Sequence, residues 1–452
     1  MRVKCIISIL IFLSFFLKIN SQESYSLAKC IEYSLQHHAS VNIYQNNIKI
    51  AKEQKREAIS YYLPQISLNG TLTDNLKLQT TIIPAGMIGD KEVAMQFGKQ
   101  YTTNIYHDIS QTVYNQSEIY NIKAGKVNIE MSQLKYKQNN ESLICNTAQA
   151  YFQVLAYKEY ESKLHDIIKS YTQLSQILEL KVQKGVALET DLERIKVSLK
   201  SAEYQLSEVE TQLRNAIDSL KYIMGLNLDA ELCISDSVNY EIYVSPPEVM
   251  ALEVNSLIEY QINKTNLKLI DYSYKAQKAE RLPSVNLFAR IGRQVYSDDF
   301  SKSFSSWNDY SYVGISISKT LFDGFRRSSK TKENKLTLQN ADLNLHLAET
   351  NYQLSFQNSE KSLLTAYNNL NGNKDNLNLA KKILDTSSLN YQKGSAPLSV
   401  FLNDDNTYKN AQLQYINSLF SYMSERLDYE KSRGTIFNFY NELKDNQNYR
   451  IK

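Results

Sequence analysis

The sequence contains two halves that repeat the same landmarks, and this duplication constrains the fold more than any other feature. Lys184-Gly185 matches Lys393-Gly394 at a separation of 209 positions, and Leu63-Pro64 matches Leu282-Pro283 at a separation of 219. The change in separation is explained by a longer loop in the first half. A chain that repeats in this way contains two copies of one structural unit, so its architecture can be predicted one half at a time.

Within each half, the spacing of apolar residues changes from helical to alternating and back. Leu164, Ile168 and Tyr171 belong to long stretches without proline in which apolar residues recur at helical spacing. Val285 and Leu287 alternate with polar residues, which predicts a strand with one apolar and one polar face. Each half is therefore predicted to be a helix, two strands, a very long helix, a tight turn and a returning helix.

These predicted elements have approximate bounds. The opening helices are placed at 25–60 and 247–281, the strands at 63–73, 102–114, 282–292 and 309–322, the loops between strands at 74–100 and 293–306, and the helical hairpins at 117–224 and 326–433. Gly185 and Gly394 mark the hairpin turns, because glycine adopts the left-handed backbone that ends a helix.

The first 22 residues have the order of a secretory signal peptide. Arg2 and Lys4 precede an apolar run from Ile6 to Leu17, which is too short to cross a bilayer as a helix. No cysteine follows the run directly, so a lipid anchor is not expected. We divide the chain into a signal peptide at 1–22, a first repeat at 23–240, a second repeat at 241–434 and a C-terminal tail at 435–452.

Charge and motifs exclude several classes of function. Without the signal peptide, 48 basic residues balance 48 acidic residues, so the chain has no electrostatic basis for binding nucleic acid. The sequence has no phosphate-binding loop, dinucleotide-binding pattern or nucleophile elbow, and we expect neither enzyme activity nor a cofactor. The histidines form no metal-binding motif, so no metal site is expected; they are His37, His38, His107, His165 and His346.

Four strands of about ten residues have the length of transmembrane β-strands. Membrane barrels start at about eight strands and have no open edge, so one chain cannot close a barrel alone. The long helices also need partners for their apolar stripes. A homo-oligomer meets both needs, and three chains would supply twelve strands. A small soluble sheet is the alternative that the residues leave open.

Taken together, these features resemble the TolC-like outer-membrane efflux family over nearly the whole mature chain. The first hairpin tip fits the family pattern, in which a turn glycine precedes an acid and a leucine: Gly185, Asp191 and Leu192. The second tip keeps Gly394 but departs at the acids, because Val400 and Asn403 stand where acidic residues are common in the family.

The resemblance implies a mainly helical protein with membrane β-strands, built from a duplicated unit of helix, β-hairpin and long helical hairpin. The expected assembly is a homotrimer whose twelve-stranded β-barrel in the outer membrane continues into a periplasmic α-helical barrel. The implied function is a passive exit duct of a tripartite efflux or type I secretion system. Its partners would be a periplasmic adaptor (membrane fusion) protein, an inner-membrane pump of the RND, ABC or MFS type, and outer membrane lipid.

The resemblance also assigns roles to residues. The hairpin tips that would contact the adaptor include Gly185, Val186, Leu188, Asp191, Leu192, Gly394, Leu398, Val400 and Phe401. Candidates for the lining of the closed periplasmic aperture are Asn403, Asp404 and Asp405. For the two aspartates, solvated carboxylates at a helix start are an equally good interpretation. The aromatic residues expected at the membrane interfaces are Tyr61, Tyr62, Tyr101, Tyr114, Trp307, Tyr310, Tyr312 and Phe322.

Two alternatives without a channel remain from the sequence. An exported periplasmic coiled-coil scaffold or adaptor would share the helical hairpins, although adaptors usually place one hairpin between compact β-domains. A surface adhesin or structural fibre would need neither the duplication nor paired strands of barrel length.

Overall fold

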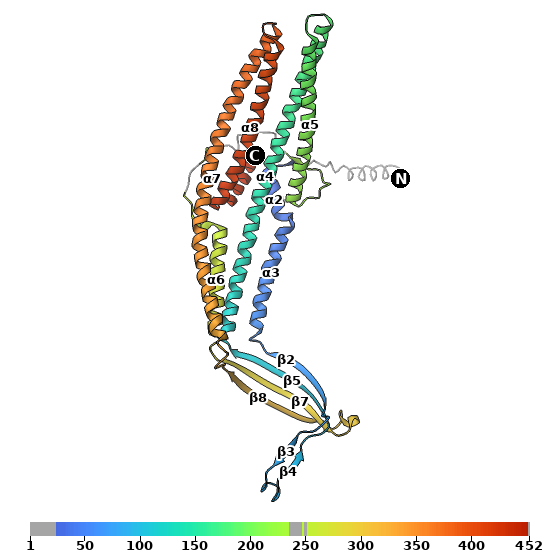
Figure 1. The fold of residues 1–452 in the computed structure, drawn as a ribbon, viewed down its shortest axis with the longest axis vertical. Coiled ribbons are helices and arrows are strands. Elements are labelled where there is room, and N and C mark those ends of the chain that lie inside the picture. Colours follow the sequence, from blue (N-terminus) through green and yellow to red (C-terminus); the bar gives the residue numbers. More distant parts are fainter. Residues whose placement is uncertain (1–23, 235–245, 248–250, 451–452) are drawn as a thin grey trace, which may run out of the picture. The chain divides into compact units, whose positions relative to one another are not determined.

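The computed structural model describes residues 24–234, 246–247 and 251–450, and it is mainly helical (Figure 1). The expected signal peptide at 1–22 and the expected repeat boundary at 240–241 lie outside the described residues. The elements of the first half are β1 (Ser24–Tyr25), α2 (Leu27–His37), α3 (Ala39–Ser60), β2 (Gln65–Asp74), β3 (Thr80–Ile83), β4 (Val93–Gln96), β5 (Tyr101–Tyr114), α4 (Gln116–Gln183), α5 (Glu189–Met224) and β6 (Cys233–Ile234). Those of the second half are α6 (Ile258–Ala279), β7 (Ser284–Ser297), β8 (Asn308–Ser318), α7 (Arg326–Gln392), α8 (Leu398–Arg433) and α9 (Ile436–Arg450), with short 3-10 turns at Val254–Ser256 and Phe300–Lys302.

The chain forms two compact units. One comprises the chain up to Gln45 together with Leu134–Gln261 and the segment from Leu347 onward. The other comprises Asn46–Gln133 and Ile262–His346. The long helices α4 and α7 contribute residues to both units.

The unit around Asn46–Gln133 and Ile262–His346 contains an antiparallel sheet with the strand order β2-β5-β7-β8 (Figure 1). The central pair, β5 and β7, joins the two sequence halves, from Tyr101 opposite Ser297 to Tyr114 opposite Val285. Among the described residues, no strand pairs with the outer side of β2 or β8. The sheet therefore has two open edges and is not a closed barrel within one chain.

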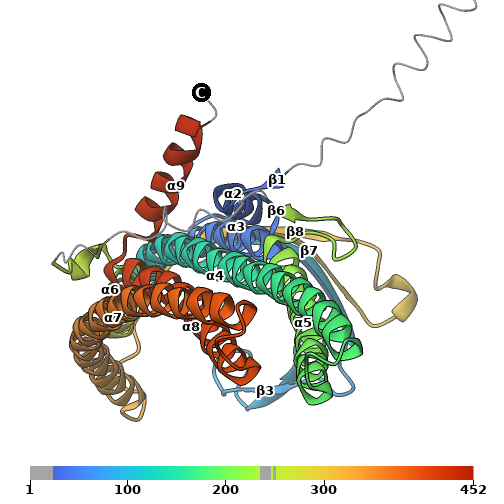
Figure 2. The same cartoon turned by 90° about the horizontal axis from the view of Figure 1, so that it is seen from above.

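The other unit holds two antiparallel helical hairpins, formed by α4 from Leu134 onward with α5 and by α7 from Leu347 onward with α8, and the helices of each hairpin run side by side (Figures 1 and 2). Gly185 and Gly394 turn the hairpins with φ angles of 70° and 75°. At each turn the residue after glycine donates a backbone hydrogen bond to a carbonyl five residues back, from Val186 to Lys181 and from Ser395 to Asn390. The two turns thus share one geometry, as expected for a duplication.

The main core of this unit lies where both hairpins meet α2 and α9. Tyr151 and Leu155 of α4 are buried there with Tyr422 and Leu427 of α8. A second, smaller cluster lies near the hairpin tips and is built around Tyr171, Leu178 and Ile195. Burial of these side chains, rather than helix propensity, stabilises helices of this length.

The helix ends show the duplication again. Gly225 ends α5 with φ 74°, and a Cβ placed on it would come within 3.0 Å of the His38 Cα. Gly434 ends α8 with φ 79°, and its Cβ would come within 3.2 Å of the Leu257 side chain. In both halves a left-handed glycine therefore packs closely against the residue that precedes the opening helix of the same half, α3 or α6.

The opening helices differ from the sequence prediction. The expected helix at 25–60 is two helices, because His38 adopts an extended backbone and its Nδ1 accepts a hydrogen bond from the Ser40 N–H, which caps α3. The expected helix at 247–281 begins only at Ile258, since Leu257 before it is extended. The expected C-terminal tail contains the helix α9.

The strand bounds also differ in detail. β7 continues to Ser297, five residues beyond the expected 292, because its neighbour β5 supplies partners as far as Tyr101. β8 ends at Ser318 instead of 322, because β7 begins at Ser284 and offers no partner beyond it. The expected loop at 74–100 contains the small hairpin β3–β4, in which Thr80 pairs with Gln96.

Candidate functional site: a two-faced sheet and linked hairpin tips

One face of the four-stranded sheet is a broad apolar surface. Cross-strand pairs bring Ile66 beside Ile109, and Leu287 beside Ile315. Ile66 is 69% exposed and Ile315 is 67% exposed within the chain. Side chains of this kind are normally covered by protein or lipid, because exposing apolar area costs about 25 cal/mol per Å². The surface is therefore built for a nonaqueous environment.

Among the helices in the described ranges, none has the combination of length and apolarity that crossing a membrane as a helix requires.

The opposite face of the sheet is polar and internally paired. Arg290 of β7 donates two hydrogen bonds to Asp108 of β5, from Nε to Oδ1 at 2.5 Å and from Nη2 to Oδ2 at 2.9 Å. The guanidinium lies 4.0 Å from the centre of the Tyr106 ring. Such a bidentate, ring-stacked pair holds its geometry better than a single contact does. One face thus presents charge and hydroxyl groups while the other presents aliphatic groups.

Two glycines on the polar face are covered by aromatic rings. Gly314 lies directly opposite Phe288, and a Cβ on Gly314 would come within 2.5 Å of the Phe288 ring. Gly292 lies opposite Tyr310, and its Cβ would come within 2.8 Å of that ring. The rings fill the space that the missing side chains leave. Each of the two strands, β7 and β8, contributes one glycine and one aromatic residue to these pairs.

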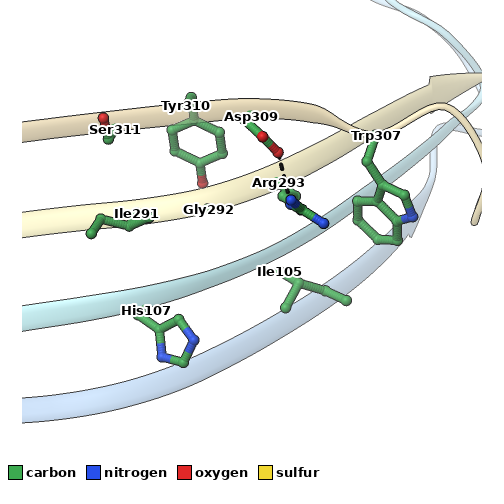
Figure 3. A pocket seen from close by; sticks show the side chains of 9 residues that line it. All are labelled: Ile105, His107, Ile291, Gly292, Arg293, Trp307, Asp309, Tyr310 and Ser311. Carbon is green, nitrogen blue, oxygen red and sulfur yellow. Dashed lines mark ion pairs between the residues drawn. The ribbon is translucent and has the colours of Figure 1, made fainter.

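A hollow of about 620 Å³ lies on the apolar face beside Trp307 (Figure 3). It is bordered by Ile105 and by an exposed ion pair in which Arg293 Nε lies 2.7 Å from Asp309 Oδ1. Trp307 donates its indole N–H to the Phe304 carbonyl at 3.1 Å. Aliphatic groups next to tryptophan and charge are typical of the boundary between lipid and water.

The expected interface aromatics fall into two groups. Six lie near the ends of the strands. The end next to the helices has Tyr61, Tyr62, Tyr114 and Phe322, and the end next to the loops has Tyr101 and Trp307. Tyr310 and Tyr312 instead turn to the polar face. The Tyr310 hydroxyl donates to Asn104 at 2.8 Å, and the Tyr312 ring lies 5.8 Å from the Arg290 guanidinium. Even-numbered residues of β8 point to the polar face, so these two rings lie away from the apolar face.

The residues expected to contact an adaptor are split between surface and core. Val186 is 71% exposed, Leu188 68% and Val400 44%. Gly185, Gly394 and Asp191 form the turns and the first turn of α5. The remaining three residues are buried in the tip cluster: Leu192, Leu398 and Phe401. Their side chains hold the two hairpins together and leave little area for a partner.

The two hairpins are also joined by a polar link near their tips. The Tyr171 hydroxyl of α4 donates a hydrogen bond to the Asp405 carboxylate of α8, and the Lys409 ammonium donates to the same hydroxyl. Lys409 Nζ lies 2.5 Å from Asp405 Oδ2, and these two side chains are 18% and 13% exposed. Burial lowers the pKa of Lys409 and raises that of Tyr171, and the Asp405 charge raises both.

This link changes the interpretation of the aperture candidates. Asp405 is neither solvated nor at a helix start, because α8 begins at Leu398 and the carboxylate is paired inside the protomer. Asn403 is exposed and Asp404 is partly exposed. No sequence motif singled out Tyr171 or Lys409 as a functional residue. The spacing of four between Asp405 and Lys409 was a usable signal for their pairing, whereas Tyr171 lies 234 positions away.

Comparisons with known proteins agree with this arrangement. The family model described as "Outer membrane efflux protein" matches residues 31–226 and 263–427. The chain is 23% identical over 404 residues to the outer membrane protein TolC of Salmonella enteritidis, covering 85% of this chain and 77% of that protein. It is 22% identical over 348 residues to TolC of Escherichia coli strain K12, covering 73% and 68%.

Two solved structures have the same fold. The CmeC outer membrane channel of Campylobacter jejuni matches with a TM-score of 0.73 at 17% identity, covering 90% of this chain and 85% of that one. The outer membrane protein VceC of Vibrio cholerae matches with a TM-score of 0.72 at 16% identity, covering 90% and 96%. The family model spans most of the chain, and the chain belongs to the outer membrane efflux protein family.

Proposed function

We propose that each chain is one third of a trimeric exit duct, whose sheet forms part of a twelve-stranded barrel in the outer membrane and whose hairpins form a periplasmic helical barrel. The observation that carries the proposal is the exposed apolar face of a sheet with two open edges. A spanning sheet without closure would leave unpaired backbone groups in lipid, which is prohibitively costly.

Strand direction supports closure between copies. β2 runs antiparallel to β5, and β8 runs antiparallel to β7. In a sheet of four alternating strands, β8 of one copy and β2 of the next would also be antiparallel. Each added copy would then extend an even-numbered antiparallel barrel, which is the form of bacterial outer-membrane barrels. Three copies follow from the family resemblance.

The polar face would then line the lumen. Asp108, Arg290 and Tyr106 form a charged but internally neutral patch there. A lumen of this kind would carry water and polar solutes. As the family resemblance implies, the duct would be passive, and an adaptor and an inner-membrane pump would deliver the cargo of an efflux or type I secretion system.

The hairpin tips would meet the adaptor and close the duct. Val186, Leu188 and Val400 are the exposed apolar side chains available for a partner. Asn403 and Asp404 are the remaining candidates for the aperture lining. The link from Tyr171 to Asp405 would hold the two hairpins in the closed arrangement, since its charged groups are buried and satisfy one another.

A periplasmic scaffold without channel activity is disfavoured by the same apolar face. A soluble protein would expose Ile66, Ile315 and their neighbours to water, where a contiguous patch of this type promotes aggregation.

The experiment uses two adjacent residues on opposite faces of β8. Ile315→Arg places a charge on the apolar face, and Ser316→Arg places the same charge on the polar face. An arginine facing lipid near the bilayer centre costs about 2–4 kcal/mol. We expect Ile315→Arg to reduce the amount of trimer extracted from the outer membrane, and Ser316→Arg to assemble normally but shift ion selectivity.

Both variants are compared with the wild type by the mass of the purified, detergent-extracted protein and by planar-bilayer conductance. Discrete long-lived conductance steps from a species of three chains would support the duct. A monomer that never inserts, or an Ile315→Arg variant that assembles as well as Ser316→Arg, would contradict it.

A further inference from the structure

Three metal-ligating side chains converge between the helices of the first hairpin. Glu161 and His165 lie four residues apart on α4, and Glu210 lies on α5. One ligand atom from each, a carboxylate oxygen or a ring nitrogen, lies within 4.8 Å of the other two. A spacing of four places Glu161 and His165 on one helix face, and the antiparallel partner brings Glu210 to the same point.

None of the three side chains forms a hydrogen bond or ion pair with another described residue, although basic residues are close in sequence. The neighbouring Lys163 pairs with Glu159 at 3.2 Å. The two glutamates are partly buried and the histidine is exposed. Two partly buried carboxylates held close together without a cation repel each other, so packing alone gives no reason for this arrangement.

The second hairpin makes the contrast clear. The two hairpin sequences align with each other at a separation of 209 positions, so Glu161 corresponds to Leu370 and Glu210 corresponds to Leu419. Leu370 is 2% exposed and Leu419 is 4% exposed, and both belong to the main core. Where the second hairpin buries two leucines in the core, the first places two carboxylates beside a histidine.

We propose that Glu161, His165 and Glu210 bind a divalent first-row transition metal ion, with Zn²⁺ as the reference ion, and that the ion clips α4 to α5. One imidazole and two carboxylates are a donor set suited to such ions. Zn–N and Zn–O bonds of about 2.0–2.2 Å place tetrahedral ligand atoms about 3.3–3.6 Å apart. Small rotamer changes would bring the three ligand atoms from within 4.8 Å to this spacing.

The exposure of His165 leaves one side of the site open. Water can complete the coordination there, as the fourth ligand of a three-residue site. The ion would neutralise the two carboxylates at the positions where the second hairpin buries two leucines. Its role would be structural, and it depends on the geometry of one hairpin alone, independent of whether the chain conducts.

The test uses tag-free, detergent-extracted protein that has been stripped with EDTA. Zn²⁺ binding is measured by calorimetry and by elemental analysis after dialysis, and Co²⁺ absorption reports the ligand set. We expect one ion per chain. Glu161→Gln, His165→Gln and Glu210→Gln should each weaken binding at least about 10-fold, which is the loss that even second-shell changes cause.

Three controls separate the site from general effects. Glu208→Gln and His346→Gln change an acid and a histidine outside the cluster, and both should bind Zn²⁺ like the wild type. The double variant Glu161→Leu with Glu210→Leu copies the second hairpin; it should fold and assemble but bind no ion at this site. Absence of stoichiometric binding in the wild type, or equal affinity in all cluster variants, would overturn the proposal.

Discussion

The hydroxyl of Tyr171 in the first hairpin donates a hydrogen bond to the carboxylate of Asp405 in the second. Lys409 completes the link as the counterion, and all three groups lie beside the apolar tip cluster. The two hairpins of one chain are therefore held together by a charged network that is mostly shielded from water. Such a network is strong while complete and costly when one member is removed.

Tyr171→Phe removes the hydroxyl and leaves the ring in place. Hydrogen bonds to charged groups contribute about 1.5–3 kcal/mol, so we expect the open fraction of the duct to rise by about 10-fold or more in planar-bilayer recordings. Asp405→Asn should act in the same direction. Asp385→Asn, an exposed change on α7, serves as the control and should behave like the wild type. Unchanged gating in both link variants would contradict the role.

The buried side chain of Glu141 should make the free energy of unfolding depend on pH. The side chain is 6% exposed, and burial, then the charge of Glu259, raise its pKa from 4.5 to about 7, while Lys431 lowers it. The folded protein therefore holds a proton that the unfolded chain releases between these pH values, so stability falls as the pH rises through this window. The full loss is about 3 kcal/mol per chain at most.

Thermal unfolding of the assembled protein at pH 5 and pH 8 measures this dependence. Glu141→Gln should remove most of the difference, because glutamine stays neutral. If the variant and the wild type lose equal stability between the two pH values, another group is responsible.

Gly314→Ala should destabilise the sheet. A Cβ at Gly314 would come within 2.5 Å of the Phe288 ring, so the ring must move and the packing on the polar face is lost. Overpacking of this kind costs about 1–3 kcal/mol. Gly70→Ala in β2 is the matched control, because no atom lies within 4 Å of its Cβ position. The temperature at which the assembly dissociates in detergent gives the comparison, and equal shifts for both variants would refute the expectation.

Gly225→Ala should cost more stability than Gly185→Ala. Both glycines have positive φ angles, of 74° and 70°, and alanine in that conformation costs about 1–2 kcal/mol. Only at Gly225 would the new Cβ also crowd backbone, since the His38 Cα lies 3.0 Å away. Chemical denaturation of both variants measures the difference. A Gly185→Ala variant as unstable as Gly225→Ala would show that the contact with His38 contributes nothing.

Local patterns in the sequence predict much of this fold. The repeat at a separation of 209, the turn glycines Gly185 and Gly394, and the alternation along 282–292 determine which residues form hairpins and strands. These signals are local because helix and strand periodicity depend on neighbours within a few positions. For that reason the observed α5 and α8 are equal in length and the apolar face of β7 lies on the odd positions.

The relationships between distant residues were decided only by the tertiary structure. Tyr171 meets Asp405 from 234 positions away, and Arg290 meets Asp108 from 182 positions away. The burial of Leu192, the turning of Tyr310 to the polar face and the convergence of Glu161, His165 and Glu210 likewise depend on which helix or strand lies alongside. Sequence periodicity determines on which face of a helix or strand a side chain lies. Only packing determines which residue of another element it contacts, because such contacts depend on register and distance.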